Sequence, residues 1–247
     1  MIVIGARQTT RPMGTLSRPS KIPIGIVTAL ALWFVYSYAY RYFTLDTDQF
    51  GIFKRRADWL VLHVAGGTIA LLIGPVQLWL GSQRGKVVLH RILGIGYLMS
   101  VAVSSAGAFY LAANTDFGWV FGLGLTSLAI AWVTTTGLAV FAISRCFIQQ
   151  HREWMIRSYV VTFSFVIFRI LVDVLEIVGT GTTVERLTVA SWLCWSVPLL
   201  ITEMMLQGRK MFVYRATVPK TLFPQRETQS QVRSEPQESS SMTASAG

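Results

Sequence analysis

The sequence predicts an all-α integral membrane protein, a bundle of six transmembrane helices with both termini in the cytoplasm. Two observations predict this fold. Hydrophobic residues make up 52% of the 247 residues and charged residues only 14%, whereas roughly a quarter of an ordinary soluble domain is charged. So few charges cannot cover a water-exposed surface, which argues against a soluble enzyme. The apolar residues are also gathered into long runs, and none of these runs alternates as a barrel strand does.

Each apolar run is long enough for one helix across the hydrocarbon core, which takes about 20 residues. Helices are expected because lipid offers the backbone no hydrogen-bond partner. The predicted spans are 22–40, 59–80, about 92–112, 119–143, 154–178 and 187–206. The chain is therefore divided into a basic arm (1–21), a six-helix transmembrane domain (22–206) and a tail (207–247).

The two ends of the chain differ in composition from the transmembrane domain. The arm is basic and holds no acidic residue, which favours a flexible cytoplasmic extension over an organelle-targeting peptide. The tail is rich in Gln, Ser, Glu and Thr, and after about residue 220 it lacks the apolar content needed to fold. We therefore expect the tail to be disordered beyond that point.

The distribution of Lys and Arg predicts the orientation of the bundle. The arm, the loops after the second and fourth spans and the start of the tail hold fourteen Lys and Arg residues, and the opposite side holds five. Because positive charge accumulates on the cytoplasmic side, both termini are placed there, in a plasma or inner membrane. The net charge of +10 is then explained by this topology and by attraction to anionic lipid headgroups. The lipid bilayer is the predicted partner, nucleic acid is not, and a homo-oligomer is left open.

Counts of a few residue types limit the chemistry. Two cysteines exclude a disulfide scaffold and a Cys-rich zinc site. Two bis-histidine haems need four histidines and the chain has three, so at most one such haem fits. No Walker loop, dinucleotide fingerprint, HExxH motif or nucleophile elbow is present.

Three ionisable residues in the run 154–178 share one helical face, namely Arg169, Asp173 and Glu176. An ionisable group at membrane depth costs at least ~2.5–3.5 kcal/mol, so each invites a functional interpretation. We expect Arg169 and Asp173 to pair within the helix, and Glu176 to reach water near the outer end. A purely structural ion pair is an equal alternative.

His63 is expected to face the interior of the bundle. Four small residues lie on its helical face, Gly66, Gly67, Ala70 and Gly74. Small residues at this spacing let another helix approach, or leave room for a flat ligand. His63 should lie in the same half of the membrane as Arg169 and Asp173, where a His–Asp contact is plausible. The predicted intramembrane polar network is His63, Arg169, Asp173 and Glu176; the alternative for His63 is a packed histidine.

The other two histidines, His90 and His151, each lie at the cytoplasmic entrance of a predicted helix and each precede an arginine. An arginine presents a planar fork of donors to phosphate or carboxylate. The candidate cofactor-binding residues are His90, Arg91, His151, Arg152 and Arg157. Interfacial anchoring is the alternative role for the arginines. Glu203 is the expected partner of one of them.

Three stretches carry a resemblance to a known family: LHVAGGTIALLIGPVQLW, LHRILGIGYL and QHREWMIRSYVVTFSFVIFR. In this order they resemble domain-of-unknown-function family 2306 (DUF2306), a set of predicted multi-pass membrane proteins, over about 59–169. The matching positions include His63, His90, Arg91, His151, Arg152, Arg157 and Arg169. The resemblance implies a multi-pass membrane fold and points to these residues, but it implies no reaction.

Several functions fit these residues. The leading hypothesis is a small redox or b-type haem-binding membrane protein, with His90 and His151 on one haem and arginines on its propionates. The first alternative is a proton-coupled transporter or carrier that uses the intramembrane network. Others are an enzyme acting on an apolar substrate, with His90 and His151 as acid–base groups, and a non-catalytic membrane assembly factor. Whether the protein is an enzyme, which residues would be catalytic and whether metal binds are left open.

Overall fold

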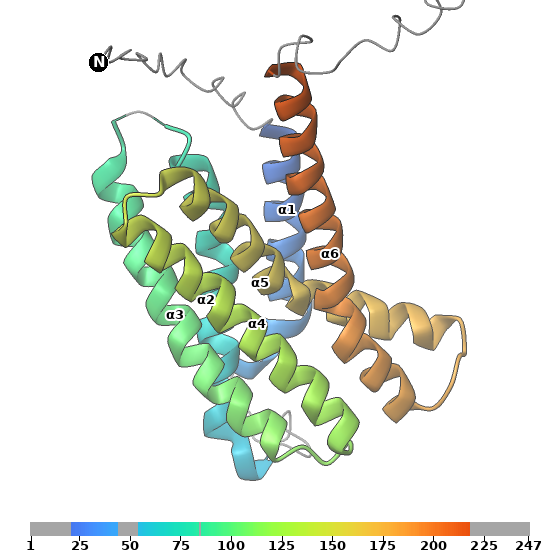
Figure 1. Cartoon of the computed structure of the whole chain (residues 1–247). Helices are drawn as coiled ribbons and strands as arrows, with labels where there is room; N and C mark the ends of the chain where they lie inside the picture. The colour runs from blue at the N-terminus through green and yellow to red at the C-terminus, as the bar shows by residue number, and fades with distance from the viewer. Residues whose placement is uncertain (1–20, 44–53, 84, 218–247) are drawn as a thin grey trace, which may run out of the picture. The chain divides into compact units, whose positions relative to one another are not determined.

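The computed structural model describes residues 21–43, 54–83 and 85–217, and within these ranges all regular structure is helical. The six α-helices are α1 (Lys21–Phe34), α2 (Ala57–Leu80), α3 (Val87–Ala113), α4 (Trp119–Ser144), α5 (Ile148–Ile177) and α6 (Thr183–Thr217) (Figure 1). The prediction of an all-α fold is confirmed. The predictions for the basic arm before residue 21 and for the tail beyond residue 217 lie outside the described residues.

Five of the described segments are long and apolar enough to cross a membrane. They are Pro23–Phe43, Lys54–Leu80, Val87–Ala113, Trp119–Ser144 and Thr183–Met211. They correspond to five of the six predicted spans. The remaining one, 154–178, lies in α5, a helix of 30 residues that carries three arginines, two glutamates and one aspartate and is not among the five.

Helices α2 to α5 form the centre of the bundle. Helix α2 packs on α3, α3 on α4 and α4 on α5, and α5 returns to α2, while α1 packs against α2 and α5. Short connections make consecutive helices antiparallel, so the bundle has two ends. We name them the His151 end, where α1, α3 and α5 begin, and the His63 end, where α2 and α4 begin (Figure 1).

Two glycines allow α2 and α3 to approach closely. A Cβ on Gly66 would lie 2.8 Å from the carbonyl oxygen of Ser100, and one on Gly107 would lie 2.9 Å from the carbonyl oxygen of Trp59. Rotation of a side chain cannot relieve contacts with backbone oxygens. The small residues of α2 therefore serve helix packing at Gly66, as small residues do in membrane bundles.

Polar side chains from three helices are hydrogen-bonded to one another in the core. The hydroxyl of Tyr97 on α3 lies 2.8 Å from those of Ser158 and Thr162 on α5, and the indole nitrogen of Trp132 on α4 donates to Thr162 at 2.8 Å. Thr136 adds a bond of 2.7 Å to Ser158. All five residues are buried. Such bonds fix the register of the three helices, each contributing about 0.6 to 2 kcal/mol in a membrane bundle.

Helix α1 changes its winding after Phe34. A π-helical turn, η1 (Val35–Ala39), is followed by a 3-10 turn, η2 (Tyr40–Phe43). The two turns change the angular spacing of the side chains along this end of the chain. Tyr38 and Tyr42 both line the same internal cavity at the His63 end, and π-helical turns are frequent at functional sites.

Helix α6 is held by two kinds of contact. Gly124 of α4 leaves room for α6, because a Cβ there would lie 2.3 Å from the hydroxyl of Ser191. Farther along, the guanidinium of Arg157 on α5 donates to Glu203 at 2.8 and 2.5 Å. By backbone contacts the chain divides into two units after Met204, and the described part of the second unit is the continuation of α6.

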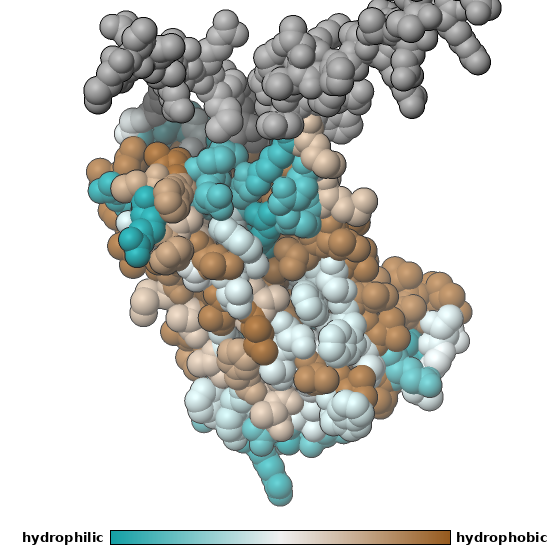
Figure 2. Space-filling view, in the orientation of Figure 1, coloured by the Kyte–Doolittle hydropathy of each residue, from teal (hydrophilic) through white to brown (hydrophobic). Residues whose placement is uncertain are grey.

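The surface of the helical region suits lipid. In Figure 2 hydrophobic residues spread along the sides of the helices, and hydrophilic residues gather near helix ends. Large apolar side chains are well exposed on several helices, among them Leu32, Ile95, Ile130 and Leu200. An apolar surface of this extent is unfavourable in water, so it supports the integral membrane assignment.

We expect Gly66→Ala to destabilise the bundle by about 1–3 kcal/mol, because the new methyl group overpacks the α2–α3 contact. Gly137→Ala is the matched control, since a Cβ on Gly137 meets nothing within 4 Å. Unfolding of both variants in detergent, followed by circular dichroism, measures the difference. Equal stability of the two variants would show that α2 and α3 do not meet in this way.

We expect Glu203→Gln to cost about 1.5–3 kcal/mol, because Arg157 loses a hydrogen-bonded charge partner. The side chain of Arg157 is only 7% exposed, and its other acidic contact, Glu153, lies at 3.9 Å. Glu176→Gln, at an exposed position of α5, should leave stability unchanged. The midpoint of denaturation in detergent is the readout, and a loss of the same size in both variants would contradict the role given to the pair.

Candidate functional site

Among the cavities in the described part of the chain, two lie at opposite ends of the bundle and are lined by the histidines. The paired-histidine cavity, at the His151 end, has a volume of about 480 Å³ and is lined by Gln77, His90, Arg91, Tyr97, His151, Arg152 and Tyr159, among others. The arginine cavity, at the His63 end, has a volume of about 220 Å³ and is lined by Tyr38, Tyr42, His63, Trp132, Phe165 and Arg169, among others. The larger one is within the usual range of ligand pockets, about 300–1,000 Å³.

The paired-histidine cavity brings together four of the five predicted cofactor-binding residues. His90 and Arg91 lie at the start of α3, and His151 and Arg152 lie at the start of α5. The fifth, Arg157, does not line this cavity among the described residues. Arg157 lies one turn after Glu153 in α5 and pairs with Glu203 on α6. The expectation that Glu203 pairs with one of the arginines is therefore confirmed.

The imidazole of His151 is fixed by a bond to the backbone. Its Nδ1 lies 2.8 Å from the carbonyl oxygen of Ala139 on α4. A carbonyl only accepts, so Nδ1 carries the hydrogen and Nε2 keeps its lone pair when the ring is neutral. Histidines that bind metal are oriented in this way by a carbonyl or carboxylate on the other ring nitrogen.

Two buried polar atoms at this cavity have no partner among the described residues, His90 Nδ1 and Gln77 Oε1. The amide nitrogen of Gln77 donates to the carbonyl of His90 at 2.8 Å, which holds its side chain beside α3. Gln77 is 3% exposed, so its amide oxygen is not reached by solvent. Buried polar atoms are nearly always hydrogen-bonded, and the exceptions call for a ligand or water.

The two arginines of this cavity, Arg91 and Arg152, form no ion pair within the described ranges. Among the described residues, the ion pairs involve other arginines, Arg56 with Asp116 and Arg157 with Glu153 and Glu203. Arg91 and Arg152 therefore remain available for an anion that enters the cavity. Carboxylate and phosphate groups match the donor fork of arginine.

The composition of this cavity limits what it can hold. No group of three or more His, Cys, Asp or Glu residues suited to a metal ion occurs in the described ranges. The cavity instead offers two imidazoles from different helices, two guanidiniums and apolar walls. Such a set can hold a flat apolar ring that carries acidic groups.

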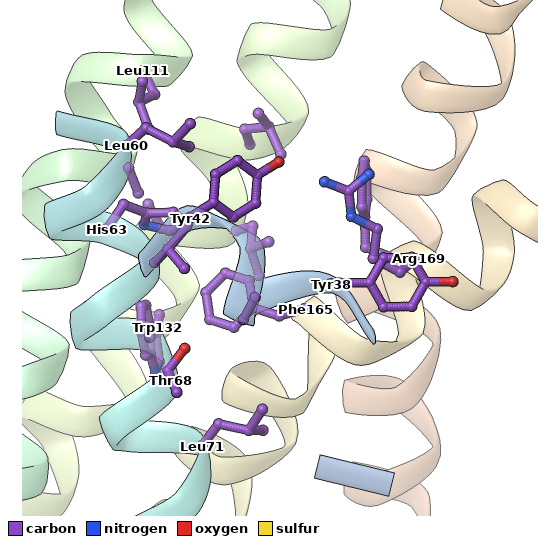
Figure 3. A pocket seen from close by; sticks show the side chains of 18 of the residues that line it. Tyr38, Tyr42, Leu60, His63, Thr68, Leu71, Leu111, Trp132, Phe165 and Arg169 are labelled. Atoms are coloured by element: carbon purple, nitrogen blue, oxygen red, sulfur yellow. The ribbon is translucent and has the colours of Figure 1, made fainter. Parts of the chain in front are cut away.

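The arginine cavity is walled mainly by aromatic and aliphatic side chains from α1 to α5 (Figure 3). His63 lies on this wall, fixed by α3. Its Nδ1 donates to the carbonyl of Ser104 at 2.9 Å, and the Ser104 hydroxyl donates back to the carbonyl of His63 at 2.7 Å. The ring also lies edge-on to Phe165, 5.3 Å between centroids.

Asp173 does not form the contacts expected from the sequence. Its carboxylate accepts a hydrogen bond from the hydroxyl of Tyr38 in η1. Within the described ranges neither the predicted Arg169–Asp173 ion pair nor the His63–Asp173 contact forms. The reason is η1, whose turn brings Tyr38 against α5 as a competing donor. Glu176 is exposed near the end of α5.

Arg169 lies among aromatic rings. Its guanidinium carbon lies 5.8 Å from the ring centre of Tyr38 and 5.9 Å from that of Phe168. Such contacts stabilise a desolvated cation by a few kcal/mol at most. They cannot neutralise its charge, so the arginine cavity has a positive side.

The hydrogen-bonded polar side chains of the core connect the walls of the two cavities. Tyr97 lines the paired-histidine cavity, Trp132 lines the arginine cavity, and Thr162 is hydrogen-bonded to both. Tyr159 makes a second link, because it lines the first cavity and donates to the carbonyl of Leu71, which lines the second. The two cavities are therefore parts of one packed interior.

The sequence interpretation missed several lining residues, above all Gln77, Tyr38 and Trp132. Gln77 is the one amide inside an otherwise apolar run, and this signal could have identified it. Tyr38 and Trp132 belong to types that usually mark the membrane interface, and their inward orientation follows from η1 and from the bond to Thr162. No local pattern reveals either one.

Comparison with known proteins gives the family. A family model described as "Predicted membrane protein (DUF2306)" matches residues 60–206. No curated protein and no solved structure matches the chain. The matched region runs from α2 to α6, includes all three histidines and extends beyond residue 169. Because it covers more than half of the 247 residues, the chain belongs to the DUF2306 family of predicted multi-pass membrane proteins.

Proposed function

We propose that this protein is a membrane redox protein that binds one b-type haem in the paired-histidine cavity. His90 and His151 would ligate the iron, and Arg91 and Arg152 would pair with the propionates. The observation that carries the proposal is the convergence of these four residues, from two helices, on one cavity of about 480 Å³. Haem b, when bound, supplies one-electron transfer.

The residues present fit this cofactor in three respects. His151 is oriented through its Nδ1 hydrogen bond to Ala139, so its Nε2 is the free ligand atom. The Nδ1 atom of His90 has no hydrogen-bond partner among the described residues, so this atom is available to a ligand. The two arginines have no acidic partner there and can meet the two propionates.

The proposal includes a placement in the membrane. We take α5 as the sixth span, because its charged side chains meet protein at Tyr38 and Glu203. Both termini are then cytoplasmic, in agreement with the excess of Lys and Arg on that side. The paired-histidine cavity faces the cytoplasm and the arginine cavity faces the opposite side.

We expect the protein, purified in detergent from haem-replete cells, to show a Soret band that shifts on reduction with dithionite. His90→Ala and His151→Ala should each remove most of the bound haem, because each deletes one axial ligand. Absorbance per mole of protein is the measurement.

Gln150→Ala is the matched control, since Gln150 is exposed and adjacent to His151 in α5. It should retain the full haem content. The proposal is wrong if the parent protein carries no Soret band, or if both histidine variants keep the spectrum of the parent.

A second candidate function is a proton-coupled carrier. The observation that favours it is the arrangement of two cavities toward opposite ends of the bundle with a hydroxyl-containing chain, Tyr97 to Thr162, between them. Asp173, bonded to Tyr38, would be the protonatable group on the far side. Against it, six helices are few for a carrier unless the protein dimerises.

For this candidate, we expect Asp173→Asn to abolish proton movement, because the amide cannot take up a proton. The parent and the variant would be compared in proteoliposomes that contain a pH-sensitive dye. Glu185→Gln, at an exposed position of α6, should behave as the parent. Unchanged proton flux in Asp173→Asn, or none in the parent, would exclude this function.

A further inference from the structure

We infer that the arginine cavity binds the acidic headgroup of a single-chain amphiphile, with Arg169 as the anion-binding residue. The shared chemistry is a carboxylate or phosphate on one long alkyl chain, as in a fatty acid or a lysophosphatidate. This site is separate from the paired-histidine cavity, so the inference does not depend on the haem proposal.

The first argument is the charge on the cavity wall. Arg169 lines the cavity, and its described neighbours are the rings of Tyr38 and Phe168, not a carboxylate. The nearest acid on its own helix, Asp173, is engaged by the Tyr38 hydroxyl. A cation in an apolar cavity strongly favours an anion that can enter, because little solvent screens the attraction.

The second argument is the direction of the side chains. In Figure 3 the guanidinium of Arg169 points to the side of Tyr42, whereas the hydroxyl of Tyr38 points the opposite way. The carboxylate of Asp173 is held by that hydroxyl, and it does not line the cavity. Tyr38 thus holds the carboxylate of Asp173 away from the part of the cavity that Arg169 faces.

The third argument is the shape and polarity of the remaining wall. Apart from His63, Arg169 and a few hydroxyls, the lining residues are aliphatic or aromatic and come from five helices. A volume of about 220 Å³ is enough for a small headgroup and part of one alkyl chain, but not for a two-chain phospholipid. His63 adds one polar ring to the wall, fixed at Nδ1 by Ser104.

The test is saturable binding of radiolabelled oleate to the full-length protein in an uncharged detergent. We expect Arg169→Gln to weaken binding at least tenfold, because the paired charge is lost, and Arg169→Lys to retain part of the affinity. Leu125→Trp should also weaken binding by filling the cavity that Leu125 lines. This second variant tests the site without removing a charge.

Competition identifies the headgroup. Oleoyl lysophosphatidate and unlabelled oleate should both displace the label, and whichever does so at lower concentration is the better source of the anion. Oleyl alcohol, which has the same chain without the charge, should not displace it. Arg186→Gln removes a cation at the start of α6 outside the cavity, and it should bind as the parent does.

Several results would overturn the inference. Equal displacement by oleyl alcohol would mean that the cavity selects only for apolar chains. Parent-like binding by Arg169→Gln, or an equal loss in Arg186→Gln, would mean that the anion binds elsewhere. The helical circular dichroism and elution volume of each variant are recorded alongside, and a misfolded Arg169 variant leaves the decision to Leu125→Trp and to the competition.

Discussion

Polar groups inside this bundle must find partners within the protein, because the surrounding lipid offers none. This constraint explains the core, where the hydroxyls and indole of Tyr97, Ser158, Thr162 and Trp132 satisfy one another across three helices. It also makes the exceptions informative. The buried atoms without a described partner include Gln77 Oε1 and the ring nitrogen of a histidine, both at one cavity. A functional site is therefore best sought where buried polar atoms have no hydrogen-bond partner within the described residues.

The two cavities share one structural feature, a histidine whose ring is fixed by the backbone. In each one, a histidine is fixed by donating Nδ1 to a carbonyl of a neighbouring helix, Ala139 for His151 and Ser104 for His63. The rings are thus oriented before any ligand arrives, which lowers the entropic cost of binding. The cavities differ in volume and charge, since one offers paired imidazoles and two arginines while the other offers one arginine in an aromatic setting.

Helix α5 connects most of these features. It contributes His151 to one cavity and Arg169 to the other, and between them it carries the serine and threonine of the polar core. Two of its charged side chains contact other elements, Asp173 at Tyr38 in η1 and Arg157 at Glu203 in α6. A helix with this many charges would need the rest of the bundle in order to span a membrane, whereas the five apolar segments are long and apolar enough by their own composition.

The sequence by itself determined the all-α membrane fold, the approximate positions of the helices and the grouping of His90 and His151 with their arginines, because these follow from apolar run length and from short loops that bring helix starts together. Tertiary structure alone decided which polar groups pair. Asp173 bonds to Tyr38 instead of Arg169 because the π-helical turn η1 carries this donor and places it against α5. A helical repeat specifies neighbours four residues apart, but it carries no information on what an adjacent helix places against them.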